Sequence, residues 1–363
     1  MIIKPPVPEK QSIQEIAKIF LGEEKILEIK DISFKQGWST KYLFEIYTEE
    51  KPLKPSTALT NKTNVKGYIL KGKTKEQRKG FMESMRLMEF LLKKGFLVRT
   101  PIKTIKGKNY SHKIKIIEEN AQTEEIYWSM TSFIGGIDSD VTKFSPNTAS
   151  QLGEKVAKYI SFTKNKKIFS KIMGISSPKQ EERLTFIRRV HRHKDFLKKM
   201  LPKEFEAFMF WEQENEPKLE WFFKSREPKA ILHGDLNQKN ILTSQDGKEI
   251  IAIIDWDHCK YDYILTDITT PINLFFEYTS CEHAEKLKKA YLEKILAKFP
   301  TKTEIVRLVG EYQASKNKWE SILFYTGLIE ELGDSTGELK QFTDNVKGEG
   351  EKWSKIMQCW ETA

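Results

Sequence analysis

One short segment in the second half of the chain combines residue types and spacings that suit chemistry. Residues 233–242 read HGDLNQKNIL, and residues 253–257 read IIDWD. Phosphoryl transfer needs a carboxylate that orients the acceptor hydroxyl and takes its proton, together with oxygen ligands for Mg²⁺ on the phosphates. An Asp and an Asn five residues apart, on a loop after a short apolar strand, supply one of each. We therefore predict phosphoryl transfer with Asp235 as the catalytic base.

The predicted metal ligands are Asn240 and Asp255, and the predicted metal is Mg²⁺. Asp255 ends an apolar strand fifteen residues after Asn240. Amide and carboxylate oxygens are the hard ligands that Mg²⁺ prefers, and the segment offers no thiolate or imidazole cage. For all three residues the alternative interpretation is a turn or cap role.

This segment resembles the aminoglycoside phosphotransferase and choline kinase superfamily, and residues 255–267 also resemble the homoserine kinase-like and spore-coat kinase-like branches. The resemblance implies an α+β, bilobal protein-kinase-like fold, with a small β-rich N-lobe and a larger, mostly helical C-lobe. It also implies transfer of a phosphate from ATP or GTP to a small molecule. Protein kinases usually have Arg and Phe where this chain has Gly234 and Trp256, and the chain lacks their Ala-Pro-Glu motif.

The resemblance also implies nucleotide-binding residues in the N-lobe. Lys71, at the end of a short strand, matches the lysine that contacts the α- and β-phosphates. Glu83, on the following helix, matches its ion-pair partner, with Lys73, Glu76 and Glu89 as weaker alternatives.

Two further N-lobe segments match parts of a nucleotide site in this superfamily. Residues 36–41 occupy the place of the turn that covers the phosphates, where Gly37, Ser39 and Thr40 fit the pattern. Residues 126–136 resemble the hinge strand, whose backbone from Thr131 to Phe133 would contact the purine.

Other polar residues near the motif receive structural roles. The resemblance implies that His233 and Asp267 support the geometry of the catalytic loop. Asp257 could contact metal or substrate, but we expect a solvated loop residue. We expect His191 and His193 to be surface residues on a basic helix rather than metal ligands.

Hydrophobic periodicity indicates the elements that position these residues. In the first part it predicts helices over 11–21 and 75–94, and strands over 29–34, 41–47, 67–71, 98–105, 113–117 and 126–134. From residue 146 it predicts helices over 147–163, 179–200 and 203–215, short strands at 230–232 and 250–254, and helices beyond 268. We assign the nucleotide-binding N-lobe to residues 1–133. The C-lobe, with catalytic loop, metal site and acceptor pocket, is assigned to residues 134–363.

Composition restricts the class of protein and its partners. The chain has 363 residues and a net charge of +10, but its lysine-rich pieces lack interleaved aromatic residues, so we expect no nucleic-acid partner. No apolar stretch is long enough to span a membrane, so we expect no membrane partner. Only three cysteines occur, and no two have metal-ligand spacing. Such a low number argues against a disulfide framework and favours a cytoplasmic protein.

The predicted function is therefore transfer of the γ-phosphate of a nucleoside triphosphate to a hydroxyl of a small molecule. An aminoglycoside, an amino alcohol, a sugar and an amino acid remain open as acceptors. The alternative is a nucleotide-binding pseudokinase with a structural or regulatory role. A protein kinase is disfavoured by the missing Ala-Pro-Glu motif.

Overall fold

The computed structural model describes residues 10–32, 42–49, 65–75, 78–107, 109–117, 123–165, 168, 184–225, 227–332 and 338–362. The chain divides into two compact units, one formed by residues 1–135 with 254–258 and the other by residues 136–253 with 259–363. The predicted boundary after residue 133 lies two residues from the first break. The functions assigned to the two lobes stay predictions.

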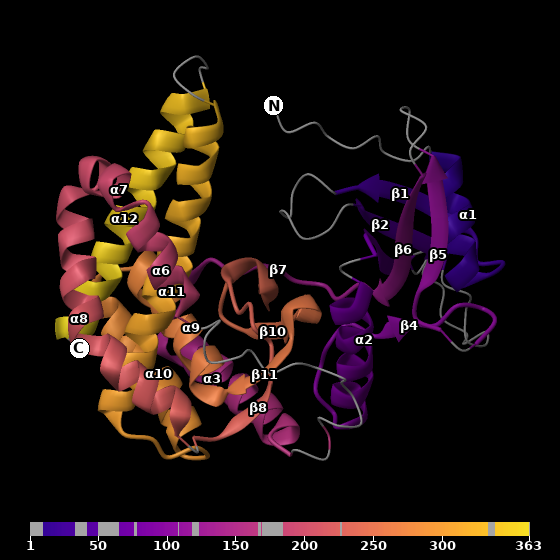
Figure 1. Cartoon of the computed structure of the whole chain (residues 1–363). Coiled ribbons are helices and arrows are strands. Elements are labelled where there is room, and N and C mark those ends of the chain that lie inside the picture. Colours follow the sequence, from indigo (N-terminus) through magenta and orange to yellow (C-terminus); the bar gives the residue numbers. More distant parts are fainter. Residues whose placement is uncertain are drawn as a thin grey trace. The chain divides into compact units, whose positions relative to one another are not determined.

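The first unit is an antiparallel sheet with helices, shown in indigo and purple in Figure 1. Its strands are ordered β1-β2-β3-β6-β4, and β5 also pairs with β6. The elements are α1 (Lys10–Leu21), β1 (Ile26–Asp31), β2 (Tyr42–Glu49), β3 (Val65–Lys73), α2 (Arg78–Lys93), β4 (Pro101–Ile102), β5 (His112–Ile117) and β6 (Thr123–Ser132), with a short 3₁₀ turn η3 (Trp256–His258).

One face of this sheet forms the core of the unit. Side chains alternate between the two faces of a strand, so alternate residues of β2, β3 and β6 point toward α1. The central core residues are Phe44, Ile46, Tyr68, Leu70, Trp128 and Met130, packed against Ile13, Ile16, Ala17 and Phe20 of α1. By the same alternation, Lys71 and Lys73 of β3 lie on the opposite face of the sheet.

The second unit consists mainly of helices. Its elements are β7 (Ile137–Asp138), η1 (Val141–Lys143), α3 (Pro146–Thr163), α6 (Thr185–Arg192), α7 (Lys194–Met200), α8 (Pro202–Lys224), β8 (Lys229–Leu232), η2 (Gln238–Asn240), β9 (Ile241–Thr243), β10 (Ile250–Ile253), β11 (Lys260–Tyr263), α9 (Ile264–Tyr278), α10 (Cys281–Leu296), α11 (Thr303–Leu332) and α12 (Glu338–Thr362). Two small antiparallel sheets, β10-β9-β7 and β11-β8, lie among them. α11 and α12 run side by side as the long helix pair in Figure 1.

The β8–β11 pair and α9 set the position of the loop that begins at His233. β8 pairs with β11 in antiparallel register, with Leu232 opposite Lys260. β11 continues directly into α9, so Asp267 in the first turn of this helix lies close to the end of β8. The loop thus begins at a point where a strand and a helix N-terminus meet.

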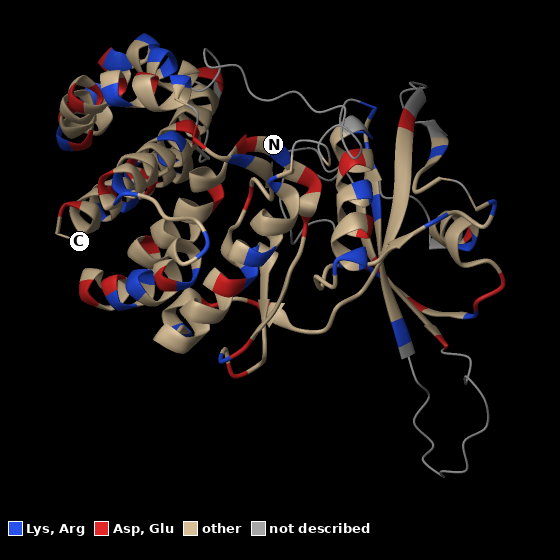
Figure 2. Cartoon of the chain, turned by 90° about the horizontal axis from the view of Figure 1, so that it is seen from below, with Lys and Arg blue, Asp and Glu red and all other residues tan. Residues whose placement is uncertain are grey.

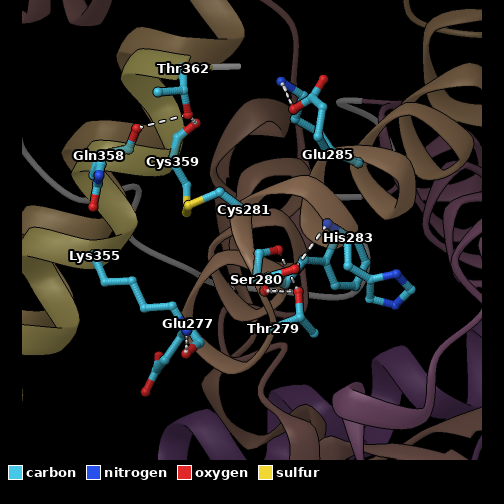
Figure 3. Close-up of a disulfide and its surroundings, with 12 residues drawn as sticks. Glu277, Thr279, Ser280, Cys281, His283, Glu285, Lys355, Gln358, Cys359 and Thr362 are labelled. Carbon is cyan, nitrogen blue, oxygen red and sulfur yellow. Dashed lines mark hydrogen bonds and ion pairs between the residues drawn. A yellow bond between two sulfur atoms is a disulfide. The ribbon is translucent and has the colours of Figure 1, made fainter.

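A disulfide links Cys281 at the start of α10 to Cys359 near the end of α12, with a Cα–Cα distance of 5.2 Å (Figure 3). The prediction that the chain has no disulfide framework is therefore wrong. The two cysteines are 78 residues apart in sequence, and only the return of α12 to the α9–α10 corner brings them together. Cys259 is buried and lies outside this disulfide.

The structure confirms most predicted elements and corrects three. The predicted strand over 98–105 is a strand only at β4, and the chain then turns at Gly107, where φ is 81°. In the described part of the predicted helix 179–200, α6 and α7 are separated at His193. The helix predicted to end near residue 215 continues through Pro217 to Lys224, because Leu219 and Phe222 are buried.

No described helix is both long and apolar enough to cross a membrane. Figure 2 shows both basic and acidic residues on the described helices of each unit.

Candidate functional site

The loop after β8 holds the carboxylate of Asp235 in a defined orientation. The side-chain amide of Asn237 donates to Asp235 Oδ1 at 2.9 Å, and that of Asn240 donates to Asp235 Oδ2 at 3.0 Å. Asn240 Nδ2 also donates to the backbone carbonyl of Asp235 at 2.8 Å. Both carboxylate oxygens thus accept hydrogen bonds from side-chain amides.

Asn237 was not assigned a role from the sequence. Its Oδ1 accepts a hydrogen bond from the backbone N–H of Lys239 at 2.9 Å and so caps the turn η2. Its Nδ2 is then directed at Asp235. An Asn immediately before a short turn is a recognisable capping signal, and this signal could have identified the residue.

A buried hydrogen-bond network anchors the start of the same loop. The carboxylate of Asp267 accepts from the backbone N–H of His233 at 2.6 Å and from that of Gly234 at 3.0 Å. The hydroxyl of Tyr159 donates to Asp267 Oδ2 at 2.6 Å. Burial, and then the charge of Asp267, raise the pKa of Tyr159 well above its usual value, so this hydroxyl stays a donor.

Two local features explain why the motif reads His-Gly-Asp. His233 is fully buried, and its Nδ1 accepts from the backbone N–H of Asp235 at 3.2 Å. Gly234 has φ = 81°, in the left-handed region that residues other than Gly rarely adopt. An Arg at this position would be strained at this φ.

The corner between α9 and α10 carries a separate group of polar contacts. Burial is the main cause that raises the pKa of Tyr278 at the end of α9. The neighbouring Glu277 is paired with Lys318 at 2.8 Å, and its backbone carbonyl accepts from Lys355 at 2.9 Å (Figure 3).

In the first unit, a second group of charged side chains surrounds Lys71. The ammonium group of Lys71 is 2.7 Å from Asp255 Oδ1 and 3.0 Å from Asp257 Oδ2. Lys73 is 2.7 Å from the same Asp257 oxygen, and Ser84 of α2 donates to Asp257 Oδ1 at 3.1 Å. Two ammonium groups and two carboxylates therefore share one small region, and their charges balance.

The expectation that Asp257 is a solvated loop residue is wrong. Its side chain is only 4% exposed. β3 places Lys71 and Lys73 on the same face of the sheet, so both can reach one carboxylate, which the local sequence around Asp257 does not reveal. Burial alone would raise the pKa of Asp257, but Lys71 and Lys73 outweigh it and hold the pKa well below its usual range.

Asp255 differs from its partners in exposure and in backbone conformation. Its side chain is 26% exposed, whereas those of Lys71 and Lys73 are 8% and 5% exposed. With φ = 61° it is the only non-glycine residue at positive φ in the described part of the chain. Such a conformation costs about 1–3 kcal/mol and is concentrated at functional sites.

Lys71 keeps its positive charge in this environment. Burial lowers the pKa of its ammonium group, but Asp255 and Asp257 together raise it above the usual value. Glu83, the predicted partner of Lys71, lies on α2 and is buried. Lys71 pairs with Asp255 and Asp257, and the role of Glu83 stays a prediction.

The other predicted nucleotide contacts stay untested. Gly37, Ser39 and Thr40 lie outside the described residues. Thr131 is buried in β6, opposite Ile69 of β3. Phe133 follows β6, and its backbone N–H donates to the carbonyl of Gly67 at 2.8 Å.

The donor atoms of Asn240 and Asp255 are chemically suited to Mg²⁺. Asn240 uses its amide nitrogen on Asp235, which leaves its side-chain oxygen for another contact. Within the described ranges there is no cluster of three or more His, Cys, Asp or Glu residues that could hold a metal on its own. The assignment of Asn240 and Asp255 as Mg²⁺ ligands stays a prediction.

His191 and His193 have carboxylate partners on the helical unit. The Nε2 atom of His191 is 2.8 Å from Glu212, and the Nδ1 atom of His193 is 3.0 Å from Glu330. Neither histidine belongs to a metal cluster of described residues.

The fold is of the protein-kinase-like class, as comparison with solved structures shows. A structure of amicoumacin kinase with AMP-PNP, Ca²⁺ and amicoumacin is similar with 16% identity, coverage of 93% of each chain and a TM-score of 0.61. Spectinomycin phosphotransferase with ADP and spectinomycin has 13% identity, coverage of 97% of this chain and 100% of that chain, and a TM-score of 0.61. A microcompartment-associated aminopropanol kinase has 12% identity, coverage of 95% and 99%, and a TM-score of 0.57.

Residues 55–300 match the model of the phosphotransferase enzyme family, and the chain belongs to this family. No curated protein matches the sequence.

Proposed function

We propose that this protein transfers the γ-phosphate of ATP or GTP to a hydroxyl group of a small molecule. The observation that carries the proposal is the geometry of Asp235, whose two carboxylate oxygens accept amide hydrogen bonds from Asn237 and Asn240. A carboxylate oriented in this way can position an acceptor hydroxyl and take its proton as the oxygen attacks the phosphate. Membership of the phosphotransferase family supports the same chemistry.

The proposed roles follow from the chemistry of each side chain. Asp235 accepts the proton of the attacking hydroxyl. Lys71, kept charged by Asp255 and Asp257, binds phosphate oxygens of the nucleotide. Asn240 and Asp255 would hold Mg²⁺ through their side-chain oxygens, and the bound ion would neutralise negative charge on the phosphates.

The acceptor is proposed only as a class. The similar structures include enzymes for spectinomycin and for aminopropanol, which are chemically unlike each other. At identities of 12–16% these similarities establish the fold but not the acceptor. Aminoglycosides, amino alcohols, sugars and amino acids therefore all belong in the first test.

The test measures transfer of radiolabelled γ-phosphate from MgATP and MgGTP to kanamycin, spectinomycin, choline, ethanolamine, homoserine and a set of hexoses. Asp235→Asn keeps the size and hydrogen-bonding oxygen of the side chain but removes its basicity. We expect this variant to lower turnover about 100- to 10,000-fold, the usual contribution of a general base.

The matched control is Asp246→Asn, which changes an exposed aspartate on the turn before β10 that pairs with Lys248. This control should transfer phosphate at the wild-type rate. If the nucleotide binds but no acceptor is phosphorylated, and basal hydrolysis is equal in the wild type and Asp235→Asn, the pseudokinase replaces the kinase as the proposed function.

A further inference from the structure

The second unit contains a groove lined by none of the residues assigned to phosphoryl transfer. It has a volume of about 950 Å³ and lies between α8, α11 and α12. Its lining residues come from 207–221, 304–311 and 353–361, so the loop 233–240 contributes nothing to it. On α12, Trp353 and Met357 line the groove, whereas Lys352 and Lys355 contact Glu277 from a different face of the helix.

Two tryptophans give the groove a fixed apolar floor. Trp211 is 5% exposed and Trp353 is 1% exposed. The indole N–H of Trp211 donates to Glu311 Oε2 at 3.2 Å, and that of Trp353 donates to Ser315 Oγ at 3.0 Å. Because both polar atoms are hydrogen-bonded within the fold, the rings are held in place.

Two further aromatic residues line the groove from α8 and remain open to water. Phe210 is 69% exposed and Trp221 is 62% exposed. They are eleven residues apart, about three helical turns, and so project from the same side of α8. Large aromatic side chains left in water beside a cavity are typical of ligand sites, since they gain from being covered.

The charge of this region is opposite to that of the whole chain. α8 has six Glu and three Lys residues, although the chain carries a net charge of +10. The groove is lined by the carboxylates of Glu214, Glu304, Glu311 and Glu361 and by the cations of Lys218 and Arg307. Arg307 is already paired with Glu311 at 2.6 Å, so the surplus charge facing an occupant is negative.

We propose that this groove binds a small organic cation, an ammonium group carried on a flat apolar body. The apolar body would stack on the aromatic side chains, and the ammonium group would lie near the carboxylates and over an aromatic face. The volume is that of a site for a compound of drug size. This site is independent of the proposed phosphotransferase activity.

Isothermal titration calorimetry without nucleotide tests the chemical class, using three indoles that share a two-carbon side chain and end in a cationic, a neutral or an anionic group. We expect tryptamine to bind, the neutral tryptophol to bind about fivefold more weakly, and indole-3-propionate more weakly still. Raising the salt concentration should weaken the binding of tryptamine and leave the affinity for tryptophol unchanged. Equal affinity of the three compounds, or no binding of tryptamine at millimolar concentration, would overturn the proposal.

Matched variants locate the site. Phe210→Ala should weaken the binding of tryptamine about tenfold. Phe324 is an exposed phenylalanine on α11 that does not line the groove, so Phe324→Ala should leave the binding unchanged. Glu214→Gln should reduce the salt dependence, whereas Glu206→Gln on the same helix should not. These four positions are on the surface, and circular dichroism verifies that each variant is folded. Equal losses in Phe210→Ala and Phe324→Ala would contradict the assignment.

Discussion

At the scale of single residues, Asp257 holds two buried ammonium groups at once. Its carboxylate is within 3.0 Å of Lys71 and 2.7 Å of Lys73, and the side chains are almost fully buried. Removal of the Asp257 carboxylate would leave these lysine charges with less compensation in the protein interior, which solvates charge poorly. Its contribution to stability can therefore be measured separately from any catalytic role.

We predict that Asp257→Asn lowers the free energy of unfolding by about 3 kcal/mol, because both lysines lose a buried counter-charge. Urea denaturation followed by tryptophan fluorescence measures this. Asp246→Asn, at an exposed ion pair, should change the same quantity by no more than about 0.5 kcal/mol. Similar values for the two variants would show that the buried cluster contributes little.

The pKa of Asp257 also predicts a pH dependence. It is lower in the folded protein than the ordinary value near 3.9, so this group stabilises the fold above about pH 4. The contribution is lost as the pH falls toward the folded-state pKa. The stability difference between wild type and Asp257→Asn should be constant from about pH 5 to 8 and shrink below about pH 4. Denaturation curves at several pH values test this, and a constant difference at acid pH would contradict it.

At the scale of elements, the disulfide joins the start of α10 to the end of α12 and closes a long stretch of chain. A cross-link of this span restricts the unfolded chain and typically stabilises a protein by about 2–4 kcal/mol. We predict that the double variant Cys281→Ser, Cys359→Ser unfolds at a lower temperature than wild type. Dithiothreitol should lower the melting temperature of the wild type toward that of the variant and leave the variant unchanged. A wild type insensitive to reductant, with the same melting temperature as the variant, would argue against a stabilising bond.

Helix packing in the second unit is tight at some glycines and open at others. A Cβ atom at Gly153 of α3 would meet the backbone of Tyr291 in α10, which cannot move aside easily. At Gly327 of α11 a Cβ atom would meet nothing within 4 Å.

We predict that Gly153→Ala destabilises the protein by about 1–3 kcal/mol. Gly327→Ala should stabilise it by about 0.5–1 kcal/mol, because Ala favours the helix. Thermal unfolding of the two variants separates the effect of helix packing at Gly153 from that of helix propensity at Gly327. Stability changes of the same sign in both variants would refute the described contact between α3 and α10.

At the scale of the whole molecule, a nucleotide that binds the folded state and not the unfolded state must raise the stability of the protein. At a concentration 100 times its dissociation constant, the gain is about 2.7 kcal/mol. We predict that MgATP raises the melting temperature of the wild type and that chelation by EDTA removes part of the rise. In Asp255→Asn this Mg²⁺-dependent part should be lost. An undiminished EDTA effect in the variant would argue against Asp255 as a metal ligand.

Much of this protein could be predicted from local sequence. The strands and helices around Lys71 and Asp235 follow from hydrophobic periodicity, which reflects burial of one face of each element. The motif residues 233–240 lie on one loop, so their spacing along the chain is close to their spacing in space. Asn237 also lies on this loop, and its position before the turn η2 is a local capping signal.

Other features depend on contacts between distant segments, and the sequence alone does not determine these contacts. The burial of Asp257 depends on two lysines more than 180 residues earlier, and the disulfide depends on the return of α12 over 78 residues. The sequence by itself determined the family, the fold class and the candidate base Asp235. Only the tertiary structure decided the partners of Lys71, the pairing of the cysteines and the acidic aromatic groove, because each depends on side chains that different elements bring together.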